Sequence, residues 1–478
     1  MKANYRQNLL AAALVGAFVI GGLAYQALAQ EAHYDKQALQ QRTLERRAVE
    51  AAIWGMPIVS FDAMRQAYFR DAKAKYNDIA FLSEPSDWKF LVTTPNNSTR
   101  YVYVNFNTKS DGPVVLEIPA AVGAGLFGTI VDAWQVPAMD VGPTGEDQGK
   151  GGKYLLLPPG HKGEIPPGYI PVVLNTYNSY ALFRAISETT SKEDVAKALA
   201  LVKQIKAYPL ANAANPPEQR YIDIHGTVFD AIVRFDASFY ESLARMINEE
   251  PVQPHDLSVM NLLRSLGIEK GHEFKPDAAT RKVLQAAAQE SNQWFMNGLI
   301  TSGDRFWPNR NWDIPFLAVG PKTGFSFMTD GMLDVDGRGI TFFTYCAPAT
   351  KLGNATFYLG TFSDNEGQRL HGANTYRLRV PPNVPAEQFW AITVYGIEDA
   401  AFFRNVSRNS LDSYDQKAKR NADGSVDIYF GPKAPAGSET NWVPTVAGKD
   451  WFPLFRFYGP EKPLFEKTWS LPDFEPVK

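Results

Sequence analysis

Hydrophobic and polar residues alternate along residues 375–380. Tyr376, Leu378 and Val380 fall on one side of an extended chain, with polar side chains between them. This period of two predicts a half-buried strand. The run at 388–396 is apolar almost throughout, which is typical of a strand covered on both faces. The two runs therefore predict two β-strands.

Shorter β-rich runs follow at 424–430, 441–444 and 455–458, separated by Gly, Pro and Asn turns. Short strands at this spacing are typical of an antiparallel sandwich. The sequence therefore predicts a C-terminal antiparallel β-sandwich, jelly-roll-like, with its core over 372–460.

The N-terminal part begins with a helical pattern and continues as a β-rich region. Apolar residues recur at helical spacing over 34–74, and Pro57 is expected to break or kink this helix. Runs rich in β-formers and separated by Gly, Pro and Asn then predict a sheet of several antiparallel strands. These runs are 90–94, 101–106, 114–118, 129–134, 154–157 and 170–174.

The middle of the chain is mainly helical in pattern. A capping box at 191–194 opens a predicted helix that ends at about Lys206. Residues 304–370 are ambiguous, because 340–347 is rich in β-branched and aromatic side chains. The predicted fold class is α+β: a β-rich N-terminal domain with a helical middle segment, and a C-terminal antiparallel β-sandwich. The further predicted helices are 235–249, 257–266 and 277–297.

The length of 478 residues favours two domains. We expect an N-terminal α+β domain over 30–310, with its core at about 85–190 and its helices at about 191–300. The C-terminal domain is expected over 311–478. No Gly/Ser linker marks the boundary, which we place within 300–372, and the two halves should therefore pack against each other.

The first 29 residues have the pattern of a secretory signal. Lys2 and Arg6 precede an apolar run at 9–24, and small residues at 27–29 form a cleavage site. An uncleaved membrane anchor is the alternative, but the run is shorter than the ~20 residues that span a bilayer. We therefore expect a periplasmic or secreted protein that is soluble after cleavage near Ala29.

The overall charge limits the class of partner. Removing 1–29 takes away two basic residues and no acidic ones, so the formal charge moves from −3 to −5. No basic stripe is present, which argues against nucleic acid or an anionic membrane as partner. A small-molecule or carbohydrate ligand is the expected partner, and the abundant aromatic residues could line its site. The sequence does not indicate an oligomeric state.

The patterns of common cofactor and metal sites are missing from the sequence. There is no dinucleotide fingerprint and no G-x-S-x-G elbow. The six His residues are not at metal-ligand spacing, and Asp334 and Asp336 resemble only the start of a calcium loop. We therefore predict neither a cofactor nor a metal.

The stretch 94–101 joins two predicted strands and is dense in amides and hydroxyls. Loops at strand ends commonly present binding groups, and Asn side chains both donate and accept hydrogen bonds. We predict that Asn96, Asn97, Thr99 and Tyr101 bind a ligand. The alternative is that these side chains bond to nearby backbone and fix a tight turn.

Asp132 and Trp134 are two residues apart and would face the same side of a strand. A carboxylate beside an indole suits a sugar site, and the carboxylate could also act as acid or base. We therefore name Asp132 as the candidate catalytic residue and Trp134 as the binding platform. The alternative is an Asp at a strand end and a Trp in the core.

Cys346 is the single Cys of the chain, so an internal disulfide is excluded. An inert buried thiol is the favoured interpretation, and a catalytic thiol is the alternative.

Several motifs occur in the order found in a bacterial exported family whose two halves are known as DUF1254 and DUF1214, and the chain resembles this family over about 45–475. The resemblance implies the two-domain fold and an exported location, and it implies no particular reaction. The motifs in the N-terminal half are Thr94–Thr99, Gly112–Pro119, Asp132–Trp134 and Gly152–Leu155 running to Gly160. Those in the C-terminal half are Tyr376–Leu378, Phe389–Tyr395, Asn421–Ser425, Asn441–Pro444 and Arg456–Tyr458.

Three functional hypotheses follow. The first is an exported hydrolase or lyase that acts on a small polar or carbohydrate-like substrate at the domain junction. The second is a non-catalytic periplasmic protein that binds a ligand or partner through the same cleft. The third is a structural envelope protein without a pocket. The first two gain if Asn97, Asp132 and Trp134 line one cavity, and a second titratable group beside Asp132 would favour the enzyme.

Overall fold

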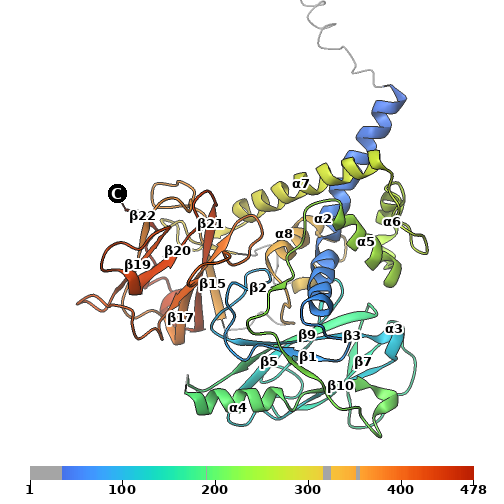
Figure 1. The fold of residues 1–478 in the computed structure, drawn as a ribbon, viewed down its shortest axis with the longest axis horizontal. Helices are drawn as coiled ribbons and strands as arrows, with labels where there is room; N and C mark the ends of the chain where they lie inside the picture. Colours follow the sequence, from blue (N-terminus) through green and yellow to red (C-terminus); the bar gives the residue numbers. More distant parts are fainter. Residues whose placement is uncertain (1–34, 190, 316–323, 351–355, 478) are drawn as a thin grey trace, which may run out of the picture. The chain divides into compact units, whose positions relative to one another are not determined.

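The described residues belong to two units, of which residues 47–478 form one and residues 1–46 the other. The described part of the unit 1–46 consists mainly of the start of helix α2 (Lys36–Arg70). The predicted signal segment 1–29 lies outside the described residues. No helix in the described part of the chain is long and apolar enough to cross a bilayer. The computed structural model (Figure 1) describes residues 35–189, 191–315, 324–350 and 356–477.

Helix α2 runs through Pro57 without a break, so the predicted break at this residue is wrong. Proline has no N–H, which leaves the Ile53 carbonyl without its helical partner. Helix α8 (Val335–Thr344) covers this point. Gly339 lies so close that an added Cβ would be 2.9 Å from the Ile53 oxygen, and Arg338 Nη2 donates to the Trp54 carbonyl at 3.1 Å. The neighbouring helix therefore covers the carbonyls beside the proline.

Two sheets form the N-terminal β-rich region. A six-stranded sheet has the order β11-β1-β3-β9-β5-β6, and a four-stranded sheet has the order β10-β4-β7-β8. The strands are β1 (Ile79–Phe81), β3 (Arg100–Asn107), β4 (Val114–Ile118), β5 (Gly125–Asp132), β6 (Pro137–Val141), β7 (Gly152–Leu157), β8 (Ile170–Val173), β9 (Asn178–Ile186), β10 (Lys206–Pro209) and β11 (Tyr221–Asp223).

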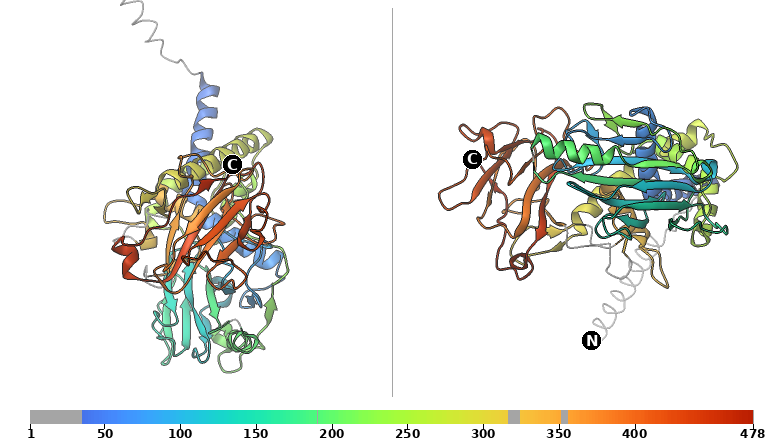
Figure 2. Two further views of the ribbon diagram at one scale, coloured as in Figure 1. Left: turned by 90° about the vertical axis from the view of Figure 1, so that its left-hand side faces the viewer. Right: turned by 90° about the horizontal axis from the view of Figure 1, so that it is seen from below.

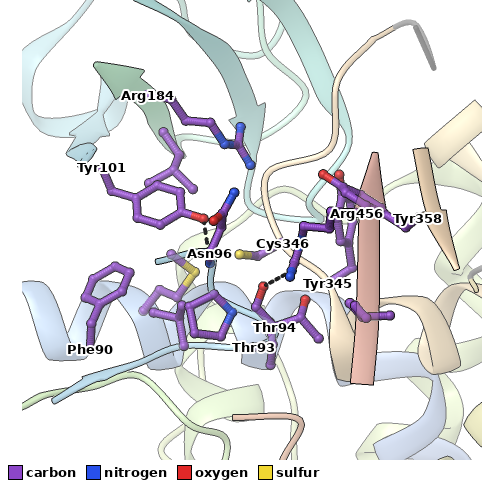
Figure 3. A pocket seen from close by; sticks show the side chains of 15 residues that line it. Phe90, Thr93, Thr94, Asn96, Tyr101, Arg184, Tyr345, Cys346, Tyr358 and Arg456 are labelled. Atoms are coloured by element: carbon purple, nitrogen blue, oxygen red, sulfur yellow. Dashed lines mark hydrogen bonds between the residues drawn. The ribbon is translucent and has the colours of Figure 1, made fainter. Parts of the chain in front are cut away.

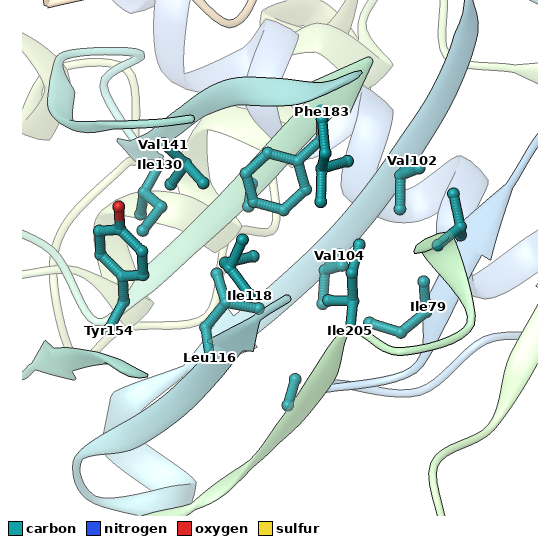
Figure 4. Close-up of a cluster of buried hydrophobic side chains, with 14 of the residues drawn as sticks. Ile79, Val102, Val104, Leu116, Ile118, Ile130, Val141, Tyr154, Phe183 and Ile205 are labelled. Carbon is teal, nitrogen blue, oxygen red and sulfur yellow. The ribbon is translucent and has the colours of Figure 1, made fainter. Parts of the chain in front are cut away.

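The facing sides of these two sheets share one apolar core (Figure 4), to which Val104 and Phe183 contribute from the first sheet and Leu116 and Tyr154 from the second. Most strand pairs are antiparallel, as predicted. The pairs β1–β11 and β7–β8 are parallel, as is the separate pair of β2 (Phe90–Leu91) and β12 (Phe229–Asp230). The predicted strand at 90–94 is thus shortened to two residues, and the chain after it forms a loop.

The helical middle follows the predicted pattern closely. The Ser191 hydroxyl accepts a hydrogen bond from the Asp194 amide and caps α4 (Lys192–Val202), as the capping box predicts. This helix ends before Lys206, which begins β10. The other helices are α3 (Thr108–Asp111), α5 (Ser238–Glu249), α6 (Leu257–Arg264), α7 (Ala278–Thr301) and α9 (Lys462–Phe465), with 3-10 turns at Leu210–Asn212, Pro254–Asp256, Gly324–Ser326 and Glu439–Asn441.

The ambiguous stretch 340–347 belongs largely to α8. Asp334 caps this helix by accepting a hydrogen bond from the Gly337 amide at 2.9 Å, so the acidic cluster that resembles a calcium loop is a helix start. Tertiary packing against α7 outweighs the local preference for a strand.

The C-terminal region is a β-sandwich, which confirms the predicted α+β class (Figures 1 and 2). One sheet has the order β13-β14-β15-β21-β17-β18 and the other β20-β19-β16-β22, and all pairs except β19–β20 are antiparallel. Trp390 and Phe455 from the first sheet and Leu378 and Phe430 from the second share the core. The strands are β13 (Asp304–Arg305), β14 (Asp313–Ile314), β15 (Thr356–Gly360), β16 (Tyr376–Val380), β17 (Ala386–Gly396), β18 (Ser410–Asp412), β19 (Val426–Gly431), β20 (Trp442–Pro444), β21 (Trp451–Pro460) and β22 (Glu475–Pro476).

The chain passes between the two regions more than once. Strands β13 and β14 already belong to the C-terminal sheet, and Trp307 and Trp312 lie in its core. The chain then returns to α8, which packs against α7 and α2. It joins the sandwich again at β15. The two regions are therefore interleaved along the sequence.

Candidate functional site

A pocket that is partly open to solvent lies where the two β-rich regions meet (Figure 3). The first region contributes residues of α2, β2, β3, β9 and the loop after β2. The C-terminal sheet contributes residues of β15 and β21, and the segment after α8 completes the wall. The lining residues are Met64, Phe90, Val92, Thr93, Thr94, Pro95, Asn96, Tyr101, Leu182, Arg184, Tyr345, Cys346, Tyr358, Leu454 and Arg456.

A cross-strand Tyr–Arg pair reaches the pocket from the first region. Tyr101 of β3 is directly opposite Arg184 of β9 in the antiparallel register. Side chains of such a pair lie on the same face, and the Arg184 guanidinium lies 5.5 Å from the centre of the Tyr101 ring. Leu182 precedes Arg184 by two residues and lines the pocket too, while Phe183 points into the core.

A second cross-strand Tyr–Arg pair comes from the C-terminal sheet. Tyr358 of β15 is opposite Arg456 of β21, and the Arg456 guanidinium lies 5.3 Å from the Tyr358 ring centre. Leu454 lines the pocket and Phe455 lies in the core. Both strands thus present the tripeptide Leu-Phe-Arg, with Leu and Arg toward the pocket and Phe away from it.

Arg456 is deeply buried, with 3% of its surface exposed. Its Nη2 donates to the Tyr395 hydroxyl at 2.7 Å and to the Thr94 carbonyl at 3.3 Å. Its Nη1 is buried and has no hydrogen-bond partner among the described residues. A buried guanidinium nitrogen without a hydrogen-bond partner lowers the stability of the folded protein. A ligand oxygen that reached Nη1 would accept a hydrogen bond from it and remove this cost.

The pocket carries positive charge that no carboxylate among its described lining residues offsets. Burial lowers the pKa of Arg184 and Arg456, because it disfavours their charged form. The surrounding tyrosines, once ionised at high pH, raise it. The net pKa of each arginine lies above its ordinary value. Burial also raises the pKa of Tyr101 and Tyr458, so these phenols are uncharged at neutral pH. None of the described residues that line the pocket is Asp or Glu. The site is therefore suited to an anion.

The predicted binding loop 94–99 forms one wall of the pocket and also joins the two regions. Asn96 lines the pocket, and its side-chain amide donates to the Tyr458 hydroxyl of the C-terminal sheet. Asn97 donates to the Ser410 hydroxyl, and the Tyr395 hydroxyl donates to the Pro95 carbonyl at 2.6 Å. The loop thus fixes the docking of the sandwich.

Thr99 and Tyr101, the other two predicted binding residues, differ in their placement. Tyr101 lines the pocket, and its hydroxyl accepts a hydrogen bond from the Asn96 amide at 3.0 Å. Thr99 is buried, does not line the pocket, and its hydroxyl has no partner within the described ranges. The structure therefore brings Asn96 and Tyr101 together, and it leaves Asn97 and Thr99 outside the lining.

Asp132 and Trp134 do not line this pocket: Asp132 is the last residue of β5, and Trp134 lies in the turn that follows. One Asp132 oxygen accepts hydrogen bonds from the backbone amides of Trp134 at 2.8 Å and Val136 at 3.0 Å. Burial raises the pKa of Asp132 to about 7, against the lowering effect of these two amides. The Trp134 ring packs against Trp54 at 4.7 Å, and Arg338 lies over it at 5.0 Å. Neither predicted residue lines the described pocket.

Cys346 lies in the pocket wall, between the two Tyr–Arg pairs in Figure 3. Burial raises the pKa of its thiol to about 11, although Arg184 and a hydrogen bond with Thr93 act in the opposite direction. The thiol is therefore protonated at neutral pH and is a poor nucleophile there. Across the described residues, no three His, Cys, Asp or Glu side chains gather in a way that would hold a metal ion.

Sequence reasoning missed Arg184, Tyr345, Tyr358 and Leu454 altogether, and it used Arg456 only as part of a family motif. The repeated Leu-Phe-Arg at 182–184 and 454–456 could have pointed to the two arginines and Leu454, but no strand was predicted at 182–184, and the predicted run 455–458 begins after Leu454. A charged residue two positions from an apolar one on a strand shares its face.

These features define a two-domain α+β protein with a cationic pocket where its β-rich regions meet. The sequence matches the family model described as "Protein of unknown function (DUF1254)" over residues 76–209 and the model "Protein of unknown function (DUF1214)" over residues 355–462. The chain is therefore a member of the family that combines DUF1254 with DUF1214, as its motifs suggest. No curated protein matches the sequence.

Two solved structures are similar to the chain. The VPA0106 protein of Vibrio parahaemolyticus has a TM-score of 0.52 and 18% sequence identity, with 91% of this chain and 100% of that chain covered. At this identity the likeness shows a shared fold alone. An uncharacterized protein from Burkholderia cenocepacia has a TM-score of 0.40 and 15% identity, with coverage of 92% and 96%.

Proposed function

We propose that this protein binds a small organic anion in the pocket between its two β-rich regions and does not convert it. The observation that carries the proposal is the pair of Tyr–Arg units, one from each region, which face the pocket without a carboxylate to neutralise them. Unpaired buried charge is expensive, so a ligand that supplies the counter-charge would bind favourably. Arginine forks are well suited to carboxylates.

Binding is favoured over conversion because the described residues of the pocket wall include no group that would accept a proton at neutral pH. Burial raises the pKa of Cys346 to about 11, and it raises the pKa of Tyr101 and Tyr345 above the ordinary tyrosine value. A general base needs a pKa near the working pH. The described lining residues therefore supply donors and charge but no such base.

A hydrolase or lyase centred on Asp132 is the second candidate. The observation in its favour is the pKa of about 7, which is suitable for an acid or base. The same oxygen already accepts two backbone amides, and the residue lies outside the pocket lining. Asp132→Asn separates the candidates, because it would abolish turnover in the enzyme and leave anion binding unchanged in the binder.

We also propose that the protein acts outside the cytoplasm, since residues 1–29 have the pattern of a cleavable signal. N-terminal sequencing of the protein from a periplasmic extract should then begin at Gln30. A protein that retains residues 1–29 in the membrane fraction would contradict the proposal.

The single thiol gives a direct test of the pocket's charge. Cys346 is the chain's one cysteine and lies in the wall, so methanethiosulfonate reagents report on this site alone. We expect the anionic sulfonatoethyl reagent to react at least about tenfold faster than the cationic trimethylammonioethyl reagent, after both rates are divided by those for free glutathione. Mass spectrometry of the intact protein gives both rates.

Matched variants assign this preference to the two arginines. Arg184→Gln and Arg456→Gln should each reduce it, and the double variant should remove it. Arg264→Gln, which removes the same charge from an exposed side chain, should leave it unchanged. Equal rates for the two reagents in the native protein, or a preference that survives the double variant, would refute an anion site.

A further inference from the structure

We infer that the bound anion is a small carboxylic acid with an apolar body, of aryl or branched-alkyl type, rather than an inorganic anion or a sugar acid. This inference rests on the proposed function and specifies the ligand of the same pocket. It follows from the division of the pocket wall into a cationic part and an apolar part, and from the hydrogen bonds that the polar groups of the wall already make.

The apolar part of the wall is provided by six side chains. Leu182 and Leu454 stand beside the two arginines on their strands, and Phe90 stacks on Tyr101 at a ring distance of 5.5 Å. Residues two apart on a strand are about 7 Å from each other, which is close to the length of a carboxylate joined to a short apolar body. The other apolar residues of the wall are Met64, Val92 and Pro95.

Inorganic phosphate or sulfate would meet the two arginines, but the loop does not add the backbone donors that phosphate sites commonly use. Phosphate sites use free backbone amides, commonly at a helix N-terminus or in a nest of successive N–H groups. Here the Thr94 amide donates to the Ala400 carbonyl at 2.7 Å, and the Asn96 amide donates to the Tyr101 hydroxyl at 3.0 Å. The loop therefore has no nest aimed at the pocket.

A sugar acid would need acceptors for its hydroxyl groups, and the main side-chain acceptor is occupied. The Asn96 side-chain oxygen accepts from the Ser98 amide at 2.7 Å, and its nitrogen donates to Tyr458. No carboxylate stands among the described lining residues to bind a polyol. An apolar body leaves these bonds intact and would contact Phe90 and the two leucines.

Calorimetric titration of the full-length mature protein with a matched ligand series tests the inference. Benzoate and 3-methylbutanoate should bind roughly 10- to 150-fold more tightly than acetate, which is the range expected for burying one apolar side chain of this size. Benzamide, which keeps the ring and loses the charge, should bind at least about tenfold more weakly than benzoate. Inorganic phosphate, gluconate and succinate complete the series.

Val92→Thr tests the apolar wall with almost no change of shape. This variant should reduce the preference for benzoate over acetate by at least about threefold. Val122→Thr, at an exposed residue, is the control and should leave this preference unchanged. The two Arg→Gln variants should weaken every carboxylate.

The outcomes distinguish a failure of the apolar-acid inference from a failure of the anion-binding proposal. If phosphate, gluconate, succinate or acetate binds as tightly as benzoate, the apolar-acid inference is overturned. The proposal of an anion-binding pocket would then still hold. If benzamide binds as tightly as benzoate, or if no anion of the series binds and Cys346 labelling shows no charge preference, both proposals fall.

Discussion

Asp132→Asn should make the stability of the protein less sensitive to pH. Asp132 is buried, and its pKa is raised from 3.8 to about 7 chiefly by burial. Asparagine has the same shape, and its side-chain oxygen can still accept from the Trp134 and Val136 amides. The variant therefore removes the ionisation and keeps the turn.

The sign follows from the protons that each state binds. Between pH 3.8 and about pH 7 the folded protein keeps the Asp132 proton and the unfolded chain has lost it. The folded state then binds more protons, so its stability falls as the pH rises and the loss is complete above the folded pKa. At about 1.4 kcal/mol for each tenfold change in proton affinity, the loss by pH 8 is about 4 kcal/mol.

Urea unfolding of the native protein and the variant across this pH range measures the effect. The difference in unfolding free energy should move by about 4 kcal/mol in favour of the variant between pH 4 and pH 8. Asp330→Asn, which removes one carboxylate from an exposed position, is the control. A constant difference for Asp132→Asn, or a variant that becomes relatively less stable at high pH, would show that Asp132 is ionised in the folded protein.

Three further predictions concern the pocket thiol, a strand contact and a helix cap. The rate at which neutral iodoacetamide alkylates Cys346 should rise about tenfold per pH unit from pH 7 to pH 9, because the pKa of the thiol is about 11. Arg184→Gln should slow this alkylation, since Arg184 lowers that pKa. A rate that reaches a plateau near pH 8.5 would contradict the prediction. Gly128→Ala should cost at least about 3 kcal/mol in urea unfolding, because its Cβ would lie 2.1 Å from the Leu182 carbonyl oxygen in the paired strand; a loss below about 1 kcal/mol would show that the sheet can adjust. Asp277→Ala should cost about 1 kcal/mol by the same assay, because Asp277 caps α7 through the Thr280 amide, and no loss would mean that the cap is dispensable.

Local signals predicted the elements that depend on neighbours in the sequence. The alternation at 376–380 became β16, and the hydroxyl of Ser191 caps α4 as its spacing indicates. The prediction failed where tertiary contacts decide. Pro57 stays inside a helix because α8 covers the carbonyls beside it, and the β-branched run at 340–344 is helical because it packs on α7.

The candidate site was harder to predict than the fold. The loop 94–99 attracted attention for its amides, and it does form a wall, but much of its hydrogen bonding holds the sandwich in place. The charged groups of the pocket come from β9 and β21, which are far apart in the sequence and belong to different sheets. Periodicity within one strand cannot show that two strands from different sheets face each other.

The interleaved path of the chain means that no single cut yields two intact halves. A protease that cleaved between α8 and β15 would leave β13 and β14 with the N-terminal fragment and strip an edge, together with Trp307 and Trp312, from the sandwich. A cut before β13 would instead carry α8 away from Pro57. Gene fragments that encode either family region alone should accordingly give insoluble products, whereas the two fragments made together have all the parts needed to reassemble.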